Sequence, residues 1–431
     1  MKLIITGTLL LIASITCYSQ RYLSELDSSL FIRDTIRPFL QRFENLRFTG
    51  YIQPQFQMAQ AEGAKTFEGG DFSQFSKSRF MLRRARIRLD YFIPSKKNRW
   101  PRALFSFQVD ATERGVNVRD MFIRLFENKY HNFSLTAGLF ARPFGYEVNL
   151  SSAYRETPER GRMSQILMPS ERDLGAMISF EPQNQKSKLA FLKVDAGLFN
   201  GQGLSGSTDF DSHKDFISRI TIKPLKVKQF EISGGISLMH GGWRQATKYI
   251  YKIQTTATGD NYFGIDSSEK NIGKITSRHY YGADIQLKLN HAWGATEWRA
   301  EYWTGKQPGT SSSSANPGVL PTGPTYIRYF DGAFFYFLQN IINSKHQLVL
   351  KYDWYDPNKK IKEDEIGKNG NNLNATDIKY STFGFGYVYY FNNNVKLTLY
   401  YDIVKNKSAL LAGYTSDFKD NVFNCRVQFR F

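Results

Sequence analysis

The strongest constraint in this sequence is an alternation of apolar and polar residues, which recurs from residue 47 to residue 431 in segments of roughly 10 to 14 residues. In the last segment, one face carries Phe423, Cys425, Val427, Phe429 and Phe431, and the other carries Asn424, Arg426, Gln428 and Arg430. A period of two residues indicates a β-strand whose two faces meet different surroundings. The chain is therefore predicted to be all-β over this range.

The number of segments and the linkers between them narrow the fold further. About sixteen segments begin near residues 47, 78, 102, 117, 133, 174, 189, 215, 228, 278, 295, 326, 346, 377, 395 and 421. Linkers after even-numbered segments are short and polar, as at residues 225–227, whereas those after odd-numbered segments are usually long, as at residues 241–276. An even number of strands with this parity is typical of a transmembrane antiparallel β-barrel with short periplasmic turns and long extracellular loops. The alternative, a soluble β-sandwich, would not be expected to show it.

Composition agrees with a barrel and excludes a bundle of membrane helices. Mean hydropathy is −0.43, and only the first 20 residues resemble the run of about 20 apolar residues that a helical span requires. In a barrel, only every second strand residue needs to meet lipid. Aromatic residues make up 15% of the chain, which is enough to supply girdles at the lipid–water boundary. The terminal Phe431 ends an alternating strand and is interpreted as the signal read by the barrel-insertion machinery.

The N-terminus predicts export. Lys2, the apolar run at residues 3–15 and the small Ser19 before Gln20 form the pattern of a secretory signal peptide, residues 1–19. A single-span anchor and a lipoprotein acylated at Cys17 are the alternatives. Residues 20–46, with apolar residues at roughly helical spacing, are expected to form a periplasmic N-terminal segment. The predicted location is the outer membrane of a Gram-negative bacterium.

The sequence does not favour an enzyme, a metal site or a cofactor. Residues 201–206 match a dinucleotide-binding fingerprint in letters, but they lie in a Ser/Asp-rich loop and open no helix. The six histidines fall in separate turns and strand ends without metal-ligand spacing. No nucleophile elbow or Ser/His pair is evident.

The candidate functional residues are arginines that the alternation turns toward the lumen. Because the last strand of a barrel pairs with the first, the inward arginines of three adjacent strands form one wall, with no carboxylate before Asp90: Arg84, Arg86, Arg88, Arg426 and Arg430. Guanidinium groups bind oxyanions, and like charges along a pore favour anions. The alternative is that acids across the lumen balance the wall, among them Asp110, Asp120, Glu231, Glu297 and Glu301.

The long linker at residues 142–173 is the candidate for a constriction loop that folds into the barrel. It carries five arginines (Arg142, Arg155, Arg160, Arg162 and Arg172) and five acids (Glu147, Glu156, Glu159, Glu171 and Asp173). With charges in balance, the loop is expected to narrow the lumen rather than repel ions of one sign.

Net charge alone does not identify the transported ion. The chain carries +18, or +17 once the signal peptide and its one lysine are removed. Many of its lysines fall in or beside the predicted short turns, away from any constriction. Nucleic acid is excluded as a partner, since the charge is spread over the rim and lumen of an exported barrel.

Several short runs resemble the phosphate-selective porin O and P family. Residues 137–147 (AGLFARPFGYE) and 171–175 (ERDLG) resemble the region of that family's constriction loop, and residues 48–55 (FTGYIQPQ) followed by 83–88 (RRARIR) resemble its opening strands. The resemblance implies a sixteen-stranded trimeric outer-membrane porin that passes anions such as phosphate or polyphosphate. The family's arginine ladder maps onto Arg84, Arg86 and Arg88, whereas its central lysine-rich site has no evident counterpart.

The resulting prediction is a porin for passive diffusion of small anions, embedded in outer-membrane lipid. Two alternatives remain at this stage. One is a general diffusion porin without phosphate selectivity. The other is a surface adhesin or glycan-binding barrel, because the loops at residues 241–276 and 306–325 are long and rich in Tyr, Ser and Thr.

Overall fold

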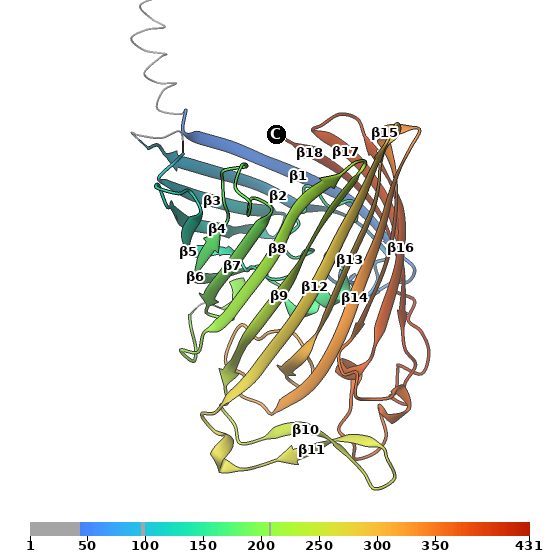
Figure 1. The fold of residues 1–431 in the computed structure, drawn as a ribbon. Helices are drawn as coiled ribbons and strands as arrows, with labels where there is room; N and C mark the ends of the chain where they lie inside the picture. Colours follow the sequence, from blue (N-terminus) through green and yellow to red (C-terminus); the bar gives the residue numbers. More distant parts are fainter. Residues whose placement is uncertain (1–43, 96–99, 207) are drawn as a thin grey trace, which may run out of the picture.

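The structure is a computed structural model that describes residues 44–95, 100–206 and 208–431. The predicted signal peptide and nearly all of the predicted N-terminal segment lie outside the described residues. Within them, every predicted alternating segment corresponds to one strand of a closed antiparallel barrel, and no start differs by more than three residues. The sixteen-stranded barrel predicted from the alternation is confirmed (Figure 1).

The barrel strands are β1 (Leu46–Ala59), β2 (Ser78–Ile93), β3 (Ala103–Thr112), β4 (Gly115–Phe126), β5 (Phe133–Ala141), β6 (Arg172–Phe180), β7 (Leu192–Phe199), β8 (Asp215–Val227), β9 (Phe230–Arg244), β12 (Ile275–His291), β13 (Gly294–Gly309), β14 (Thr325–Ile341), β15 (Asn343–Asp356), β16 (Tyr380–Tyr390), β17 (Val395–Asn406) and β18 (Val422–Arg430). A separate hairpin consists of β10 (Ile250–Thr255) and β11 (Asn261–Asp266). The helices are short: α4 (Arg162–Leu167) and the 3₁₀ helices η2 (Gly203–Ser205), η3 (Glu269–Asn271), η4 (Glu363–Glu365) and η5 (Ala375–Asp377). None of the helices in the described ranges is long and apolar enough to cross a membrane.

The barrel closes where the first strand meets the last. β1 pairs with both β2 and β18, and β9 pairs with β12 across the inserted hairpin. Gly50 and Phe431 exchange two backbone hydrogen bonds of 3.0 Å, so the pairing extends to the C-terminal residue. The Phe431 ring stacks on that of Phe48, with ring centroids 5.4 Å apart.

Each strand buries one face and exposes the other, as the period of two requires. On β1, Gln53, Gln55 and Gln57 point into the barrel and are buried, whereas Ile52 and Met58 point outward and are exposed. Polar residues are therefore inside and apolar residues outside, which is the reverse of a soluble protein and suits a lipid-facing wall.

The two ends of the barrel differ in the length of their connections. One end carries short turns and the C-terminus, and the other carries the long loops and the β10–β11 hairpin (Figure 1). At the end with the long loops, the β3–β4 connection departs from the usual length and contains only Glu113 and Arg114.

The connection between β5 and β6 lies inside the barrel and packs its apolar side chains into the hydrophobic core. Its side chains Phe144, Val148, Met163 and Leu167 pack against inward-facing strand residues, among them Ile217, Met239, Tyr280, Trp303, Phe330 and Tyr355. The Phe144 ring lies edge-on to Trp303, with centroids 4.8 Å apart. The core of this protein is therefore a loop buried against the inner wall.

Closure of the barrel can be tested with the native cysteine. Phe56 on β1 pairs directly with Cys425 on β18, in a register where paired Cα atoms lie about 5.5 Å apart, a separation that a disulfide spans. We expect Phe56→Cys to form an intrachain disulfide on mild oxidation, detected after denaturation by a non-reducing gel shift and a loss of two hydrogens by mass. Met58→Cys, offset by two residues, is the matched control and should cross-link poorly. Equal cross-linking of both variants would contradict this register.

Candidate functional site

The loop at residues 142–171 is attached to the barrel wall by a carboxylate that binds three arginines. Glu159 accepts hydrogen bonds from Arg84 at 2.6 Å, Arg83 at 2.8 Å and Arg426 at 2.9 Å. Burial would raise the pKa of Glu159, but the charges of the three arginines outweigh it and hold the pKa well below its usual range. The carboxylate therefore stays ionised and binds the loop to β2 and β18.

Two further carboxylates of the loop bind the opposite wall. Glu156 accepts hydrogen bonds of 2.8 and 3.0 Å from the guanidinium group of Arg299 on β13. Glu147 lies 3.2 Å from Nζ of Lys351 on β15 and accepts a 2.8 Å hydrogen bond from the hydroxyl of Tyr336 on β14. The loop is thus fixed to several sides of the lumen.

A strand carboxylate holds the start of the same loop by its backbone. Glu301 on β13 accepts hydrogen bonds from the amides of Tyr146 at 2.7 Å and Glu147 at 2.9 Å. Gly145, with φ of +70°, lies so close that a Cβ there would come within 2.5 Å of Glu301 Oε1 and 2.6 Å of Trp303 Cζ2. The conformation and the close approach both require glycine at this position.

The predicted arginine wall lies on the inner face of three adjacent strands, but most of it is neutralised. Arg84 and Arg426 bind Glu159 of the loop, so the expectation of no nearby carboxylate before Asp90 is wrong. Arg86 binds Asp110 at 2.8 Å. Glu159 comes from the loop and Asp110 comes from the adjacent strand β3, so the alternation of β2 alone predicts neither contact.

The two remaining arginines of the predicted wall are more accessible. Arg88 binds Asp90 at 2.9 Å and approaches Asp120 at 3.5 Å, and a third of its side chain is exposed. Arg430 donates to the backbone oxygen of Asn393 and lies 4.9 Å over the ring of Tyr154. Asp110 and Asp120, which were placed across the lumen in the alternative interpretation, lie on β3 and β4 next to the wall.

A β-bulge adds one arginine that the alternation misses. The register between β1 and β2 shifts after Gln53 pairs with Arg84, so that Pro54 pairs with Leu82. Arg83 is the extra residue, and it joins Arg84 in binding Glu159 inside the barrel. Because a bulge breaks the period of two, two consecutive arginines face the lumen.

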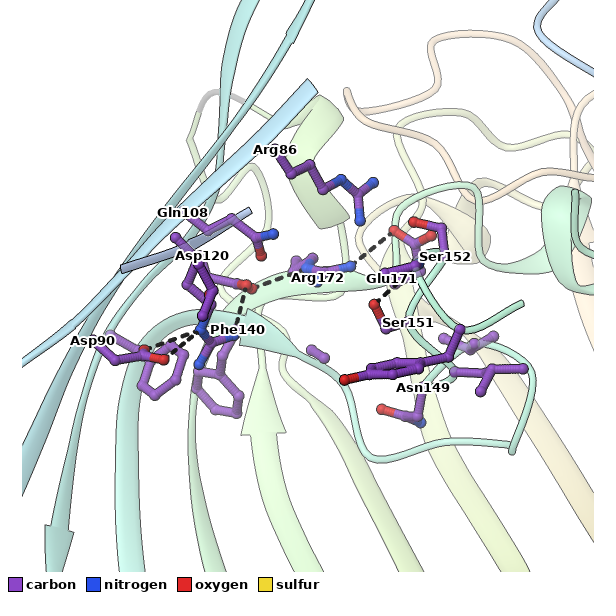
Figure 2. A pocket seen from close by; sticks show the side chains of 18 of the residues that line it. Arg86, Asp90, Gln108, Asp120, Phe140, Asn149, Ser151, Ser152, Glu171 and Arg172 are labelled. Atoms are coloured by element: carbon purple, nitrogen blue, oxygen red, sulfur yellow. Dashed lines mark hydrogen bonds and ion pairs between the residues drawn. The ribbon is translucent and has the colours of Figure 1, made fainter. Parts of the chain in front are cut away.

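The five predicted arginines of the loop serve mainly to fold it. Arg142 donates to the backbone oxygen of Ser170, Arg155 to that of Leu150 and Arg160 to those of Ser164 and Met168. Arg162 lies 3.8 Å over the ring of Tyr380. Arg172 binds Asp120 at 2.9 Å and Glu171 at 3.3 Å (Figure 2).

A cavity of about 850 Å³ remains between the loop and the wall formed by β18 and β1–β8. Figure 2 shows residues that line it, with Arg86 and Arg172 on one side and Asn149, Ser151 and Ser152 of the loop on the other. Nine basic residues line the cavity: Arg47, Arg86, Arg88, Arg124, Arg155, Arg172, Lys193, Arg219 and Arg430. The four acidic residues in the lining are Asp90, Asp120, Glu171 and Asp195. The lining therefore carries a clear excess of positive charge.

Four of these arginines have no carboxylate within 4.0 Å among the described residues: Arg47, Arg124, Arg155 and Arg430. Arg47, Arg124 and Arg219 were not identified from the sequence as candidate residues. The signal for Arg124 was present, because Asp120, Phe122 and Arg124 alternate with Met121 and Ile123 in the predicted fourth segment. The alternation in this segment places Arg124 on the inward face, so it was predictable as a lumen residue.

Nothing in the described ranges forms a group of three or more residues able to hold a metal ion. Residues 201–206, which match a dinucleotide-binding fingerprint in letters, make a turn with the short helix η2 between β7 and β8. The strand–helix–strand unit that such a fingerprint needs is replaced there by two antiparallel strands.

Comparison with known proteins places the fold among outer-membrane porins. No protein-family model matches the sequence, and no curated protein matches it. The structure is similar to that of OprB from Pseudomonas putida at high pH (TM-score 0.60, 9% identity, covering 93% of this chain and 97% of that chain). It is also similar to an anion-selective porin from Comamonas acidovorans (TM-score 0.54, 11% identity, 90% and 99%) and to the outer membrane channel DcaP of Acinetobacter baumannii (TM-score 0.54, 14% identity, 90% and 97%). At these identities the similarity shows the fold: the chain folds as an outer-membrane porin.

Substitution of Gly145 tests the seating of the loop. Gly145→Ala should displace the loop from Glu301 and lower the free energy of unfolding by about 1–3 kcal/mol, because it combines a strained φ with a steric overlap. The measurement is equilibrium unfolding of the folded barrel in urea, together with single-channel conductance, which should rise. Gly413→Ala is the matched control, since Gly413 also has a positive φ (+83°) but has open space around its Cβ position. Equal effects of both variants would contradict the assigned contact.

Acid should release the loop through Glu147. Burial raises the pKa of Glu147, but the charges of Lys351 and Arg155 with hydrogen bonds from Ser164 and Tyr336 outweigh it and lower the pKa to about 2. A carboxyl whose folded pKa lies below its unfolded value of about 4.3 stabilises the fold above that value and loses this contribution as the pH falls through the folded pKa.

We therefore expect cleavage of residues 142–171 by pepsin to increase between pH 4 and pH 2. Cleavage in the connection at residues 245–274, which contains the β10–β11 hairpin and lies outside the lumen loop, provides the internal reference for the activity of pepsin itself. Glu147→Gln cannot titrate and should show a smaller change over the same range. An unchanged pH profile in that variant would remove Glu147 from this role.

Proposed function

We propose that this protein is an outer-membrane channel for the passive diffusion of small anions. The observation that carries the proposal is the composition of the cavity lining, which contains nine basic and four acidic residues. A water-filled space lined mainly by one sign of charge concentrates the opposite ion and speeds its passage. The porin fold supports the proposal, since it supplies a lumen that crosses the membrane.

The unpaired arginines are the residues proposed to attract anions. Arg124 and Arg430 line the cavity without an ion-pair partner in the described structure, whereas the charge of the buried Arg155 acts on Glu147 of the same loop. In contrast, Arg84 and Arg426 form ion pairs with Glu159, which compensates their charges. Of the arginines proposed to attract anions, only Arg430 therefore belongs to the wall that the sequence suggested.

Phosphate and polyphosphate are proposed substrates because of the resemblance to the phosphate-selective porin O and P family. A guanidinium group binds a phosphate oxygen pair by two parallel hydrogen bonds. The same resemblance motivates the proposal of a homotrimer. Removal of residues 1–19 on export is proposed from the signal-peptide pattern, and Phe431 is proposed as the insertion signal because it ends an alternating strand. The exposed ring of Phe431 at the end of β18 is available for such recognition.

A general diffusion pore is the second candidate function. It is favoured by the ion pairs of Arg84, Arg86 and Arg426, which leave the predicted wall with little net charge. Such a pore would discriminate weakly between small anions and cations.

The zero-current potential across a planar bilayer under a KCl gradient separates the two candidates. The wild-type channel is expected to prefer chloride, and Arg124→Gln combined with Arg430→Gln should shift the potential toward potassium by removing two uncompensated charges. Lys228→Gln combined with Lys345→Gln removes the same charge from two exposed positions, one in the β8–β9 turn and one near the start of β15, and should leave the potential unchanged. A wild-type potential of the cation-selective sign would overturn the proposal, and a potential near zero would favour the general pore.

A further inference from the structure

The cavity contains a patch in which apolar side chains surround the uncompensated Arg124. Phe122 and Arg124 are two residues apart on β4 and both face inward. The guanidinium carbons of Arg88 and Arg124 lie 6.0 and 5.7 Å from the centroid of the Phe122 ring. One aromatic ring on the cavity wall is thus flanked by two positive charges.

The strand register extends this patch across neighbouring strands. Arg124 pairs with Leu104 on β3 and with Thr136 on β5, and Thr136 pairs with Met177 on β6. Leu104 and Met177 both line the cavity. The row therefore places apolar side chains on both sides of Arg124.

A second aromatic ring belongs to the same patch. Phe140, labelled in Figure 2, lies 6.0 Å from Phe122 between ring centroids and also lines the cavity. Phe199 packs behind it at 5.3 Å and is fully buried, which fixes the position of Phe140. The apolar surface is consequently rigid and preformed.

The guanidinium group of Arg124 has free donors directed at this space. Its Nε donates a 2.9 Å hydrogen bond to Thr136 Oγ1, which orients the group. In the described ranges its two terminal nitrogens donate to no protein atom, and no carboxylate lies within 4.0 Å. A carboxylate ligand would therefore find two parallel donors that the protein leaves unused.

We propose that this patch, formed by Arg124, Arg88, Leu104, Phe122, Phe140 and Met177, binds organic carboxylates with an aromatic or branched apolar body. The carboxylate pairs with Arg124, and the apolar body packs against the side chains around it. The inference rests on the proposed anion channel and narrows its substrate class. An inorganic anion such as phosphate can use the arginine but has no apolar surface to remove from water, so the rings and the two aliphatic side chains contribute nothing to its binding.

The test compares ligands that differ by one chemical feature in blocking the KCl current of the full mature channel. Benzoate, acetate, inorganic phosphate and uncharged benzyl alcohol are added in turn, and the concentration that halves the current is measured for each. Benzoate should block at a concentration about tenfold lower than either acetate, which lacks the ring, or phosphate. Benzyl alcohol, which lacks the charge, should block least.

A variant assigns the effect to this site. Arg124→Met keeps most of the side-chain length and should raise the half-blocking concentration of benzoate about tenfold, with a smaller rise for phosphate, which can also use the other arginines of the lining. Lys345→Met, at an exposed position near the start of β15, should leave both values unchanged, and heat-modifiable migration on gels verifies that each variant is folded. Because the comparison among ligands uses the unaltered protein, it stands even where a variant fails to fold.

The outcomes separate this inference from the proposed function. An anion-selective channel that benzoate and acetate block equally would overturn the inference and leave the proposed function intact. Equal loss of benzoate block in Arg124→Met and Lys345→Met would also overturn it. A cation-selective zero-current potential would instead overturn the proposed function, and with it the basis of this site.

Discussion

The interaction on which the lumen depends is the contact of Glu159 with Arg83, Arg84 and Arg426. Without the carboxylate, three guanidinium groups from β2 and β18 would face one another inside the barrel, where removing one partner of a buried ion pair costs about 3–5 kcal/mol. Conversely, a loop that carries an acid needs a basic wall on which to rest. The strands that close the barrel and the loop that fills it therefore stabilise each other, and the arginine-rich sequence of β2 serves assembly of the lumen first.

This contact divides the arginines into two groups with different consequences for ions. Those bound to carboxylates fix the loop but contribute little to the electric field in the lumen, whereas Arg124 and Arg430 have no ion-pair partner among the described residues. Two inner lysines also bind the loop. Lys351 donates to the carboxylate of Glu147, and Lys396 donates to the backbone oxygens of Ala153 and Arg155. The number of basic residues in a lumen is thus a poor guide to selectivity, because the field depends on those that no acid compensates.

The strands were predictable to within three residues because their period of two follows from backbone geometry and from the two environments of a barrel wall. The lumen was less predictable, for two physical reasons. The bulge that turns Arg83 inward interrupts that period on β2, where no glycine or proline marks it, and the only such residue at the register shift is Pro54 on the paired strand β1. The partner of Arg426 lies 267 residues away in an irregular loop, so no local pattern indicates that Glu159 neutralises it.

The position of the cavity follows from the two-sided character of the loop. Its apolar side chains, including Phe144 and Met163, pack against the inner aromatic residues of β12–β15, such as Trp303, and fill that side of the lumen. Its polar segment at residues 149–152 faces the other side, where it lines the cavity together with β2–β6. Since the loop covers the aromatic wall of β12–β15 and leaves Arg124 on β4 partly exposed to the cavity, the chemistry available to a passing solute is set by which wall the loop occupies. Gly145 helps to determine which wall the loop occupies, because its close contact with Glu301 and Trp303 directs the start of the loop along β13.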